Sequence, residues 1–359
     1  MVILHIVKSY GNKCNGVSVV VPQYVKFQSE YADVRLVNIT GQDAGIGNLQ
    51  LEYAGTKNFP DYLPSPYNKP DLVVINEVNN IENIAIYRNL IKRNIPYIII
   101  PHGELTETAL RKKAFKKKIA YILLFNKFIK NAKAVQCLSD KELSATKKKT
   151  PEKFIATNGI SDMETKKEKF STDGCKLVYI GRLEVYIKGI DRLIEGIAKI
   201  KDYCVKSGVS LDIYGPDYAG RKAEITELIA VNGVGDIVKL HDPVFGEEKI
   251  NTLLKSDIFI QLSRNEGLPL GILEAMNAGL PVILTEGTNI AEEAESYGYG
   301  YYSGETAEEV AETIIRAVED RERWADKGKK GVEYTREKYS WQSIAAETVK
   351  EYKRITERK

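Results

Sequence analysis

Two acidic residues flank a glycine- and proline-rich loop in the second half of the chain. Glu266 precedes this loop and Glu274 follows it, and the loop itself consists of Gly267, Leu268, Pro269, Leu270 and Gly271. A helix is predicted over residues 270–278, with Gly279 as its C-cap. The free N–H groups and the dipole at such a helix N-terminus favour a phosphate. Two carboxylates beside a phosphate site need other ligands, such as sugar hydroxyls. An ordinary α/β unit with two solvated glutamates is the alternative.

A second set of charged residues lies where another predicted strand runs into a loop, within and after residues 176–183. Arg182 and Lys188 stand close together in the sequence, next to Gly181 and Gly189, and a helix is predicted to begin near Gly189. A guanidinium fork and a flexible ammonium can neutralise a diphosphate from two sides. Either residue alone would be an ordinary surface charge.

The pattern Glu-Gly-x6-Glu-Ala-Met-x-x-Gly-x-Pro-Val, from Glu266 to Val282, resembles the signature of glycosyltransferase family 4. The segment from Arg182 to Gly189 is similar to the Gly-Arg-Leu…Lys-Gly motif of that family. The resemblance covers nearly the whole chain and is sharp at these two segments. It implies a retaining glycosyltransferase similar to those of bacterial surface polysaccharides. Such an enzyme moves a sugar from a nucleotide diphosphate sugar to a saccharide or lipid-linked saccharide, in surface polysaccharide or glycolipid synthesis.

The resemblance also implies a role for each of these residues. Arg182, Lys188 and the loop amides would stabilise the leaving diphosphate without a metal ion or other cofactor. Glu266 would hold hydroxyls of the donor sugar, and Glu274 those of the ribose. Retention in this family is usually explained by front-face attack, in which the departing phosphate oxygen takes the acceptor's proton and no protein nucleophile is required. In relatives the turn at Gly215 helps to hold the nucleobase, whose identity is not legible from this sequence.

The elements that must position these residues are strands alternating with helices, which is typical of a doubly wound parallel sheet. A length of 359 residues suits two α/β domains. The resemblance implies two Rossmann-like domains facing a central cleft, the GT-B fold. We expect an acceptor-binding domain at residues 1–165, completed by the C-terminal helix at about 340–359, and a nucleotide-sugar-binding domain at 166–339. The polar stretch 161–175 is interpreted as a linker.

Gly16 and His102 are the candidate site residues of the first domain. Gly16 follows Asn15 and would let the backbone come close to a ligand at a helix start. Family members often have two glycines here, and Asn15 replaces the first. His102 follows the predicted strand 97–100, at the strand end where open α/β sheets bind ligands. A lone histidine is more often structural, but the Pro-His-Gly step resembles that of surface-polysaccharide transferases, which places His102 near donor sugar and acceptor.

A basic cluster begins an amphipathic segment at residues 111–125 and comprises Arg111, Lys112, Lys113, Lys116, Lys117 and Lys118. Residues 101–150 contain thirteen Lys/Arg against four Asp/Glu, whereas the whole chain carries a net charge of only +3. A basic amphipathic helix favours an anionic surface by about 1 kcal/mol per Lys/Arg near it. We therefore expect docking to the inner face of a membrane, with a solvated helix as the alternative. No nucleic-acid partner is expected, because the charges lack interleaved aromatics or a recognisable module.

Composition narrows the class of protein further. Hydrophobic residues make up 43% and charged residues 28%, as in globular proteins with real cores, and no apolar run is long enough to span a membrane. The start of the chain is predicted to be a buried strand rather than a signal peptide. Four cysteines without a CxxC pair predict free thiols in a cytoplasmic protein, and three histidines offer little for a metal site.

Two function classes compete with sugar transfer. A nicotinamide-dependent oxidoreductase would need a G-x-G-x-x-G fingerprint, which the sequence lacks. A non-catalytic, basic membrane- or nucleic-acid-binding α/β protein would leave Arg182, Lys188 and the two glutamates unexplained. The sugar, the base, the acceptor, the linkage and the oligomeric state stay open.

Overall fold

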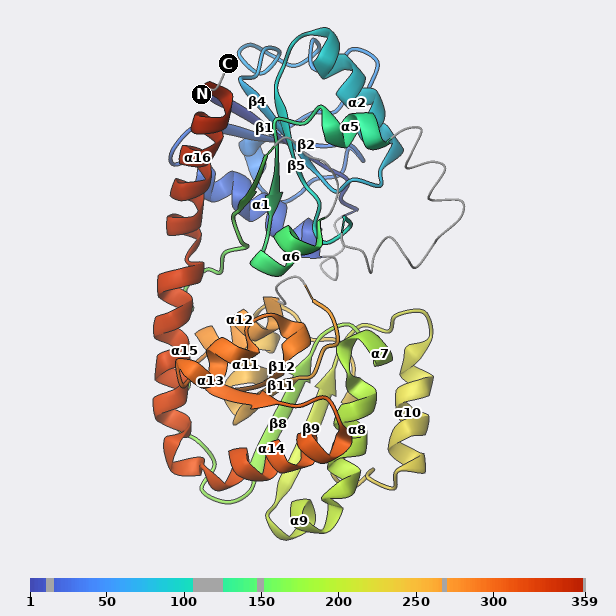
Figure 1. Ribbon diagram of the computed structural model, residues 1–359, viewed down its shortest axis with the longest axis vertical. Helices are drawn as coiled ribbons and strands as arrows, with labels where there is room; N and C mark the ends of the chain where they lie inside the picture. Colours follow the sequence, from blue (N-terminus) through green and yellow to red (C-terminus); the bar gives the residue numbers. More distant parts are fainter. Residues whose placement is uncertain (11–15, 106–124, 147–151, 267–269, 358–359) are drawn as a thin grey trace. The chain divides into compact units, whose positions relative to one another are not determined.

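The protein is described by a computed structural model over residues 1–10, 16–105, 125–146, 152–266 and 270–357 (Figure 1). The chain divides into two compact units. The first comprises Met1–Gly159 and Trp341–Lys359, and the second comprises Ile160–Ser340. The division therefore falls slightly before the boundary expected at residue 165, and the C-terminal residues return to the first unit.

The first unit is built on a parallel sheet of seven strands in the order β3-β2-β1-β4-β5-β6-β7. Its strands are β1 Val2–Val7, β2 Asp33–Asn38, β3 Gln50–Leu51, β4 Leu72–Asn76, β5 Tyr97–Ile100, β6 Ala134–Cys137 and β7 Lys153–Ile155. The helices described are α1 Gly16–Gln28, α2 Ile81–Lys92, α5 Asn126–Lys130, α6 Asp140–Ala145 and α16 Trp341–Glu357. The chain thus builds outward in both directions from the neighbouring strands β1 and β4.

Side chains alternate between the two faces along each strand. The apolar side chains of this sheet are therefore divided between two layers of helices. In β4, Leu72 and Val74 pack with α1 and α16, whereas Val73 and Ile75 pack with α2 and α5. Each of these four side chains is fully buried, and burying one stabilises the fold by roughly 1.5–3 kcal/mol. A continuous apolar strand is therefore the expected sequence of a central parallel strand.

The C-terminal helix α16 is anchored in the first unit by its first residue. The ring of Trp341 packs edge-on against Tyr24, with ring centroids 4.9 Å apart. A Cβ atom on Gly159 would lie 2.4 Å from the same indole ring, so only glycine fits there. Farther along the helix, the Tyr352 hydroxyl donates to Gln136 Oε1 at 2.7 Å.

The second unit contains a parallel sheet of six strands in the order β10-β9-β8-β11-β12-β13. Its strands are β8 Cys175–Ile180, β9 Val209–Tyr214, β10 Val238–His241, β11 Ile258–Gln261, β12 Val282–Thr285 and β13 Gly300–Ser303. Its helices are α7 Val185–Lys188, α8 Ile190–Lys199, α9 Lys201–Lys206, α10 Arg221–Val231, α11 Gly246–Lys255, α12 Leu270–Asn277, α13 Ala291–Ser296, α14 Ala307–Glu319 and α15 Trp324–Tyr339.

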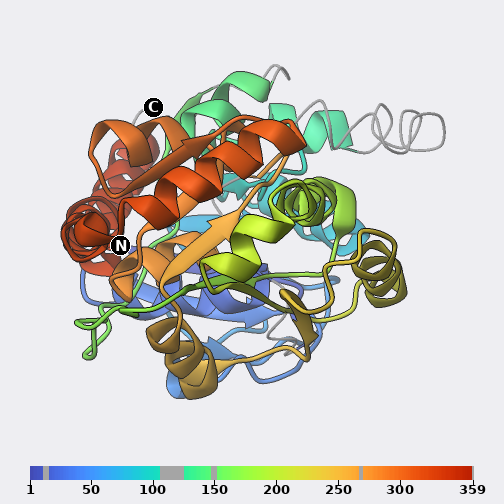
Figure 2. The same cartoon turned by 90° about the horizontal axis from the view of Figure 1, so that it is seen from below.

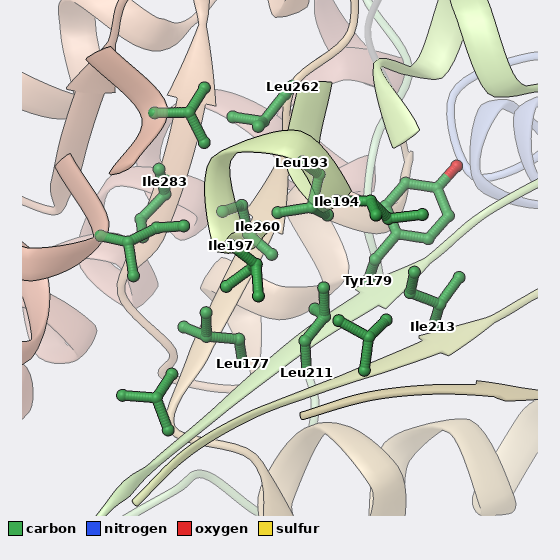
Figure 3. Packing of buried hydrophobic residues seen from close by; sticks show 14 of the residues in the cluster. Leu177, Tyr179, Leu193, Ile194, Ile197, Leu211, Ile213, Ile260, Leu262 and Ile283 are labelled. Carbon is green, nitrogen blue, oxygen red and sulfur yellow. The ribbon is translucent and has the colours of Figure 1, made fainter. Parts of the chain in front are cut away.

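Two apolar layers cover the faces of this sheet. On one face, Leu177, Leu211 and Ile260 pack against α8 and α14, which lie side by side (Figures 2 and 3). On the other face, Val178 and Phe259 pack against α12, α13 and α15. Because both faces are covered, the polar groups that can meet a ligand are concentrated at the strand ends.

The segment interpreted as a linker at 161–175 packs against the second unit, so that interpretation is wrong. The Lys167 N–H donates to Ala278 O at 2.8 Å, and its ammonium donates to Leu254 O at 3.1 Å. The Lys167 side chain is 5% exposed and lies 3.6 Å from the buried carboxylate of Asp257. A buried lysine next to a buried aspartate is a tertiary arrangement, and a polar composition alone could not reveal it.

Candidate functional site

The second sheet has a topological switch point between β8 and β11. Strand order runs outward from these neighbours, through β9 to β10 on one side and through β12 to β13 on the other. Open α/β sheets bind ligands at the carboxyl ends of the strands that flank such a point. Arg182 lies in the loop after β8, Lys188 ends the short helix α7 that follows this loop, and Glu266 lies in the loop after β11. The predicted residues thus lie at the position that the topology favours.

Lys188 and Glu266 form an ion pair across the switch point, with their side chains only 12% and 14% exposed. The Ser263 hydroxyl donates to Glu266 Oε1 at 3.0 Å, and Gln261 Nε2 donates to the same oxygen at 3.3 Å. No donor from the described part of the chain reaches Glu266 Oε2. The carboxylate is therefore held by one oxygen, and the other can accept from a ligand hydroxyl.

Backbone contacts hold these two loops together. The Arg264 N–H donates to Ile187 O at 2.8 Å. Gly189 has a left-handed φ of 68°, and a Cβ atom there would lie 1.9 Å from Leu262 O. A glycine must therefore follow Lys188, because the loop after β11 passes directly over it. The Lys-Gly step of the sequence motif has a packing reason as well as a chemical one.

A third loop supports Glu266 from the side of β12. The Glu266 N–H donates to Gly287 O at 2.8 Å, and Asn289 Nδ2 donates to Glu266 O at 2.5 Å. A Cβ atom on Gly287 would lie 2.0 Å from Ser263 O. The backbone of Glu266 is thus fixed at both its N–H and its C=O.

Arg182 is exposed at the same strand ends. Its guanidinium lies over the ring of Tyr218, 5.4 Å from the centroid, and its carbonyl accepts from the Tyr179 hydroxyl at 2.9 Å. Within the described residues no carboxylate pairs with Arg182, so its charge is available to an anion. Gly215 packs here against the loop after β8, since a Cβ atom on it would lie 1.8 Å from Gly181 O.

Helix α12 supplies the remaining predicted residues. It begins at Leu270, and Gly279 beyond its end has a φ of 87°, as a C-cap glycine should. A Cβ atom on Gly271 would lie 3.0 Å from Ile180 O, so the first turn of the helix sits close to the end of β8. Glu274 is ion-paired with Lys249 of α11. The loop residues Gly267, Leu268 and Pro269 lie outside the described residues.

These groups can bind a phosphorylated sugar compound. Arg182, Lys188 and Lys249 provide three cations against the two carboxylates of Glu266 and Glu274. Each carboxylate is paired with a lysine by one oxygen. A site with excess positive charge and two fixed acceptors suits an anion that also carries hydroxyls. The described residues contain no His/Cys/Asp/Glu cluster that could hold a metal ion.

His102 lies at the carboxyl end of β5 in the first unit. Asn76 Nδ2 donates to Ile6 O at 3.0 Å, so Asn76 Oδ1 faces His102 Nε2 at 3.1 Å. Because an amide oxygen only accepts, Nε2 carries the hydrogen and Nδ1 has a free lone pair. Burial, followed by the nearby His5, lowers the pKa of His102 to about 4. The ring is therefore neutral near pH 7 and can accept a hydrogen bond through Nδ1.

Glu77 is a residue that the sequence analysis missed. It follows β4 with a left-handed φ of 66°, which is rare outside glycine. Its carboxylate accepts from Asn80 Nδ2 at 3.2 Å, whereas the nearby Glu104 is occupied by the N–H groups of Val78 and Asn79. Burial, followed by the charge of Glu104, raises the pKa of Glu77 to about 7. The signal that identified His102, a polar residue directly after a buried strand, also applies to Glu77.

The other predictions for the first unit have mixed outcomes. Gly16 is the first residue of α1 and is exposed, and its assignment to donor binding stays a prediction. The basic cluster 111–118 lies outside the described residues. No described helix is both long and apolar enough to cross a membrane. Cys137, Cys175 and Cys204 are buried free thiols, as predicted for them.

The second unit is similar in sequence to known glycosyltransferases. The sequence model described as "Glycosyl transferases group 1" matches residues 161–334. MMP alpha-(1->4)-mannosyltransferase of Mycolicibacterium hassiacum is 25% identical over 185 residues, which are 51% of this chain and 44% of that protein. GDP-mannose:cellobiosyl-diphosphopolyprenol alpha-mannosyltransferase of Xanthomonas oryzae is 27% identical over 165 residues, 46% of this chain and 42% of that protein. The chain thus matches less than half the length of these curated relatives.

Solved structures match the whole chain at the level of the fold. Sucrose-phosphate synthase from Thermosynechococcus elongatus aligns with a TM-score of 0.77 at 16% identity, covering 99% of both chains. HepE of Anabaena, in complex with UDP and glucose, aligns with a TM-score of 0.75 at 16% identity, covering 98% of this chain and 99% of that one. These likenesses confirm the predicted GT-B fold of two Rossmann-like α/β domains.

Proposed function

We propose that this chain, whose second unit belongs to the group 1 glycosyl transferases, transfers a sugar from a nucleotide diphosphate sugar to a saccharide or lipid-linked saccharide. The observation that carries the proposal is the meeting of Arg182, Lys188 and Glu266 at the switch point, beside the helix that bears Glu274. Cations there can bind a diphosphate, and the carboxylate oxygens that accept no hydrogen bond from the described residues can bind hydroxyls. An oxidoreductase or a passive binding protein requires neither arrangement.

In the proposed reaction, the bond between the anomeric carbon and the diphosphate oxygen breaks as the acceptor hydroxyl attacks the same face. The new glycosidic bond forms with retention, and the acceptor's proton passes to the departing phosphate oxygen. Arg182 and Lys188 stabilise the negative charge that develops on the diphosphate. Glu266 holds the donor sugar through its free oxygen. No metal ion is needed, because fixed cations perform the charge stabilisation.

The acceptor belongs to the first unit in this proposal, at the edge where His102 and Glu77 follow β5 and β4. The Xanthomonas relative is named for a GDP-mannose donor and an acceptor linked to diphosphopolyprenol. A lipid-linked acceptor would explain the basic cluster 111–118, because such acceptors are held in a membrane. We therefore propose a peripheral enzyme at the inner, cytoplasmic face of an anionic membrane, acting in surface polysaccharide or glycolipid synthesis.

Calorimetric titration of the purified protein with UDP, GDP and ADP tests the donor site. One of these nucleotides is expected to bind in buffer containing a strong chelator. Binding that requires added magnesium or manganese would contradict the metal-free phosphate site. If none of the three binds under either condition, the proposed function is wrong.

A further inference from the structure

We infer that Lys249 is a positioning residue of the donor site: it orients Glu274 toward the nucleotide ribose and offsets the charge of that carboxylate beside the diphosphate. The inference rests on the proposed function and adds a residue to it. Lys249 lies in the first turns of α11, and Glu274 lies in the middle of α12. The two ends of this contact come from separate elements, so the pair forms only in the folded unit.

The helices that carry the pair contribute side chains to the same buried core. Val244, just before α11, and Leu253 within it share one buried core with Ile272 and Met276 of α12. The side chains of Lys249 and Glu274 are 22% and 35% exposed. They are therefore partly shielded from water and still open to a ligand. An ion pair in this position is better ordered than a fully exposed one.

The contact uses one oxygen of the carboxylate. Lys249 Nζ donates to Glu274 Oε2, and no donor from the described part of the chain reaches Oε1. Lys188 and Glu266, which pair across the switch point, repeat this arrangement. In each pair a lysine fixes the carboxylate by one oxygen and leaves the other to a hydroxyl. A preorganised acceptor loses less side-chain freedom on binding than a mobile glutamate does.

Charge balance gives Lys249 a second task. A diphosphate bound near Arg182 and Lys188 would repel a bare carboxylate at residue 274. The lysine cancels that charge while leaving Oε1 free to accept from the ribose. Glu274 can therefore serve a highly anionic ligand without opposing its binding.

Comparing ribonucleotides with 2′,3′-dideoxy nucleotides tests this inference. The wild type is expected to bind the best of UDP, GDP and ADP about tenfold or more tighter than its dideoxy form, as hydrogen bonds to a charged group predict. In Lys249→Met the ratio of the two dissociation constants, dideoxy nucleotide over ribonucleotide, should fall toward one. Lys249→Arg should restore most of this ratio. The dideoxy nucleotide should still bind Lys249→Met, which shows that the site is folded.

Two further variants separate the alternatives. Lys222→Met removes a lysine of the same unit whose ion pair with Asp242 is exposed, and it should leave the ratio unchanged. In a Glu274→Gln background, Lys249→Met should have no further effect on the ratio. If Lys249→Met weakens both nucleotides equally, or weakens neither, Lys249 does not act through the ribose and the inference is overturned. If the wild type binds no nucleoside diphosphate, the proposed function itself fails.

Discussion

Arg182 and Lys188 both provide positive charge to the proposed donor site, but their surroundings differ. Arg182 is exposed and stacks on Tyr218, whereas Lys188 neutralises the nearly buried Glu266. Replacing Arg182 with Ala removes one charge-assisted interaction with the diphosphate. Replacing Lys188 with Ala removes such an interaction and also leaves a carboxylate unpaired next to the ligand. The two residues are therefore not equivalent, although the sequence motif presents them as a pair.

We predict that Arg182→Ala weakens nucleoside diphosphate binding by about 1–3 kcal/mol and that Lys188→Ala weakens it more. Calorimetric titration measures both, with Lys222→Ala as a control for an exposed lysine of the same unit. Unchanged affinity in both variants would remove these residues from the donor site. A larger loss for Arg182→Ala than for Lys188→Ala would contradict the cost assigned to unpaired Glu266.

Glu77 gives the first unit a group that titrates close to neutral pH. Its pKa is raised to about 7, so the folded protein holds this proton more tightly than the unfolded chain does. The resulting stabilisation is complete below the ordinary glutamate pKa and is lost as the pH rises through about 7. Glu82 is the opposite case, because hydrogen bonding to Lys8 lowers its pKa.

We therefore expect Glu77→Gln to gain thermal stability relative to the wild type as the pH is raised from about 5 to about 8. The neutral glutamine avoids the cost of ionising a partly buried carboxylate. Thermal midpoints of the two proteins across this range measure the effect. Glu82→Gln is the control and should show no such gain. A constant difference between wild type and Glu77→Gln would show that Glu77 does not titrate in this range.

At the scale of elements, the sequence patterns predicted the first strand, the strands that precede His102 and Arg182, and the helix that carries Glu274. The apolar run in β5 and the glycine after α12 are local signals, and the structure confirms both. The pairing of Lys249 with Glu274 was not predictable, because it depends on how the fold places α11 relative to α12. The burial of Lys167 beside Asp257 was missed for the same reason. Short edge strands such as β3 and β13 also carry too little pattern to be recognised.

The basic segment 111–118 is the element for which the sequence predicts a surface role. Replacing Lys112, Lys113, Lys116 and Lys117 with Gln should abolish sedimentation with anionic vesicles, because electrostatic attachment requires those charges. Raising the salt from 0.1 M to 1 M should release the wild type, since the Debye length falls from about 10 Å to about 3 Å. Nucleoside diphosphate affinity should stay unchanged. Equal sedimentation of variant and wild type would favour a solvated helix instead.

For the whole molecule, the two sheets explain why the proposed nucleotide-sugar site and the proposed acceptor site belong to different units. Each unit places its polar residues at the carboxyl ends of parallel strands, and each sheet has one switch point. The second unit carries the cations and paired glutamates suited to a nucleotide sugar. The first carries a neutral histidine and a titrating glutamate, which suit an uncharged hydroxyl. The proposed sugar transfer uses both kinds of site.

The most direct test of sugar transfer is the release of nucleoside diphosphate from a panel of nucleotide sugars, measured with lipid-linked saccharide acceptors and a strong chelator present. The account predicts that the wild type releases the diphosphate from at least one donor and that the acceptor gains a sugar with retained anomeric configuration. Glu266→Gln should lose this activity, because the carboxylate that holds the donor sugar is gone. An inverted product, activity that depends on added metal, or full activity in Glu266→Gln would contradict the account.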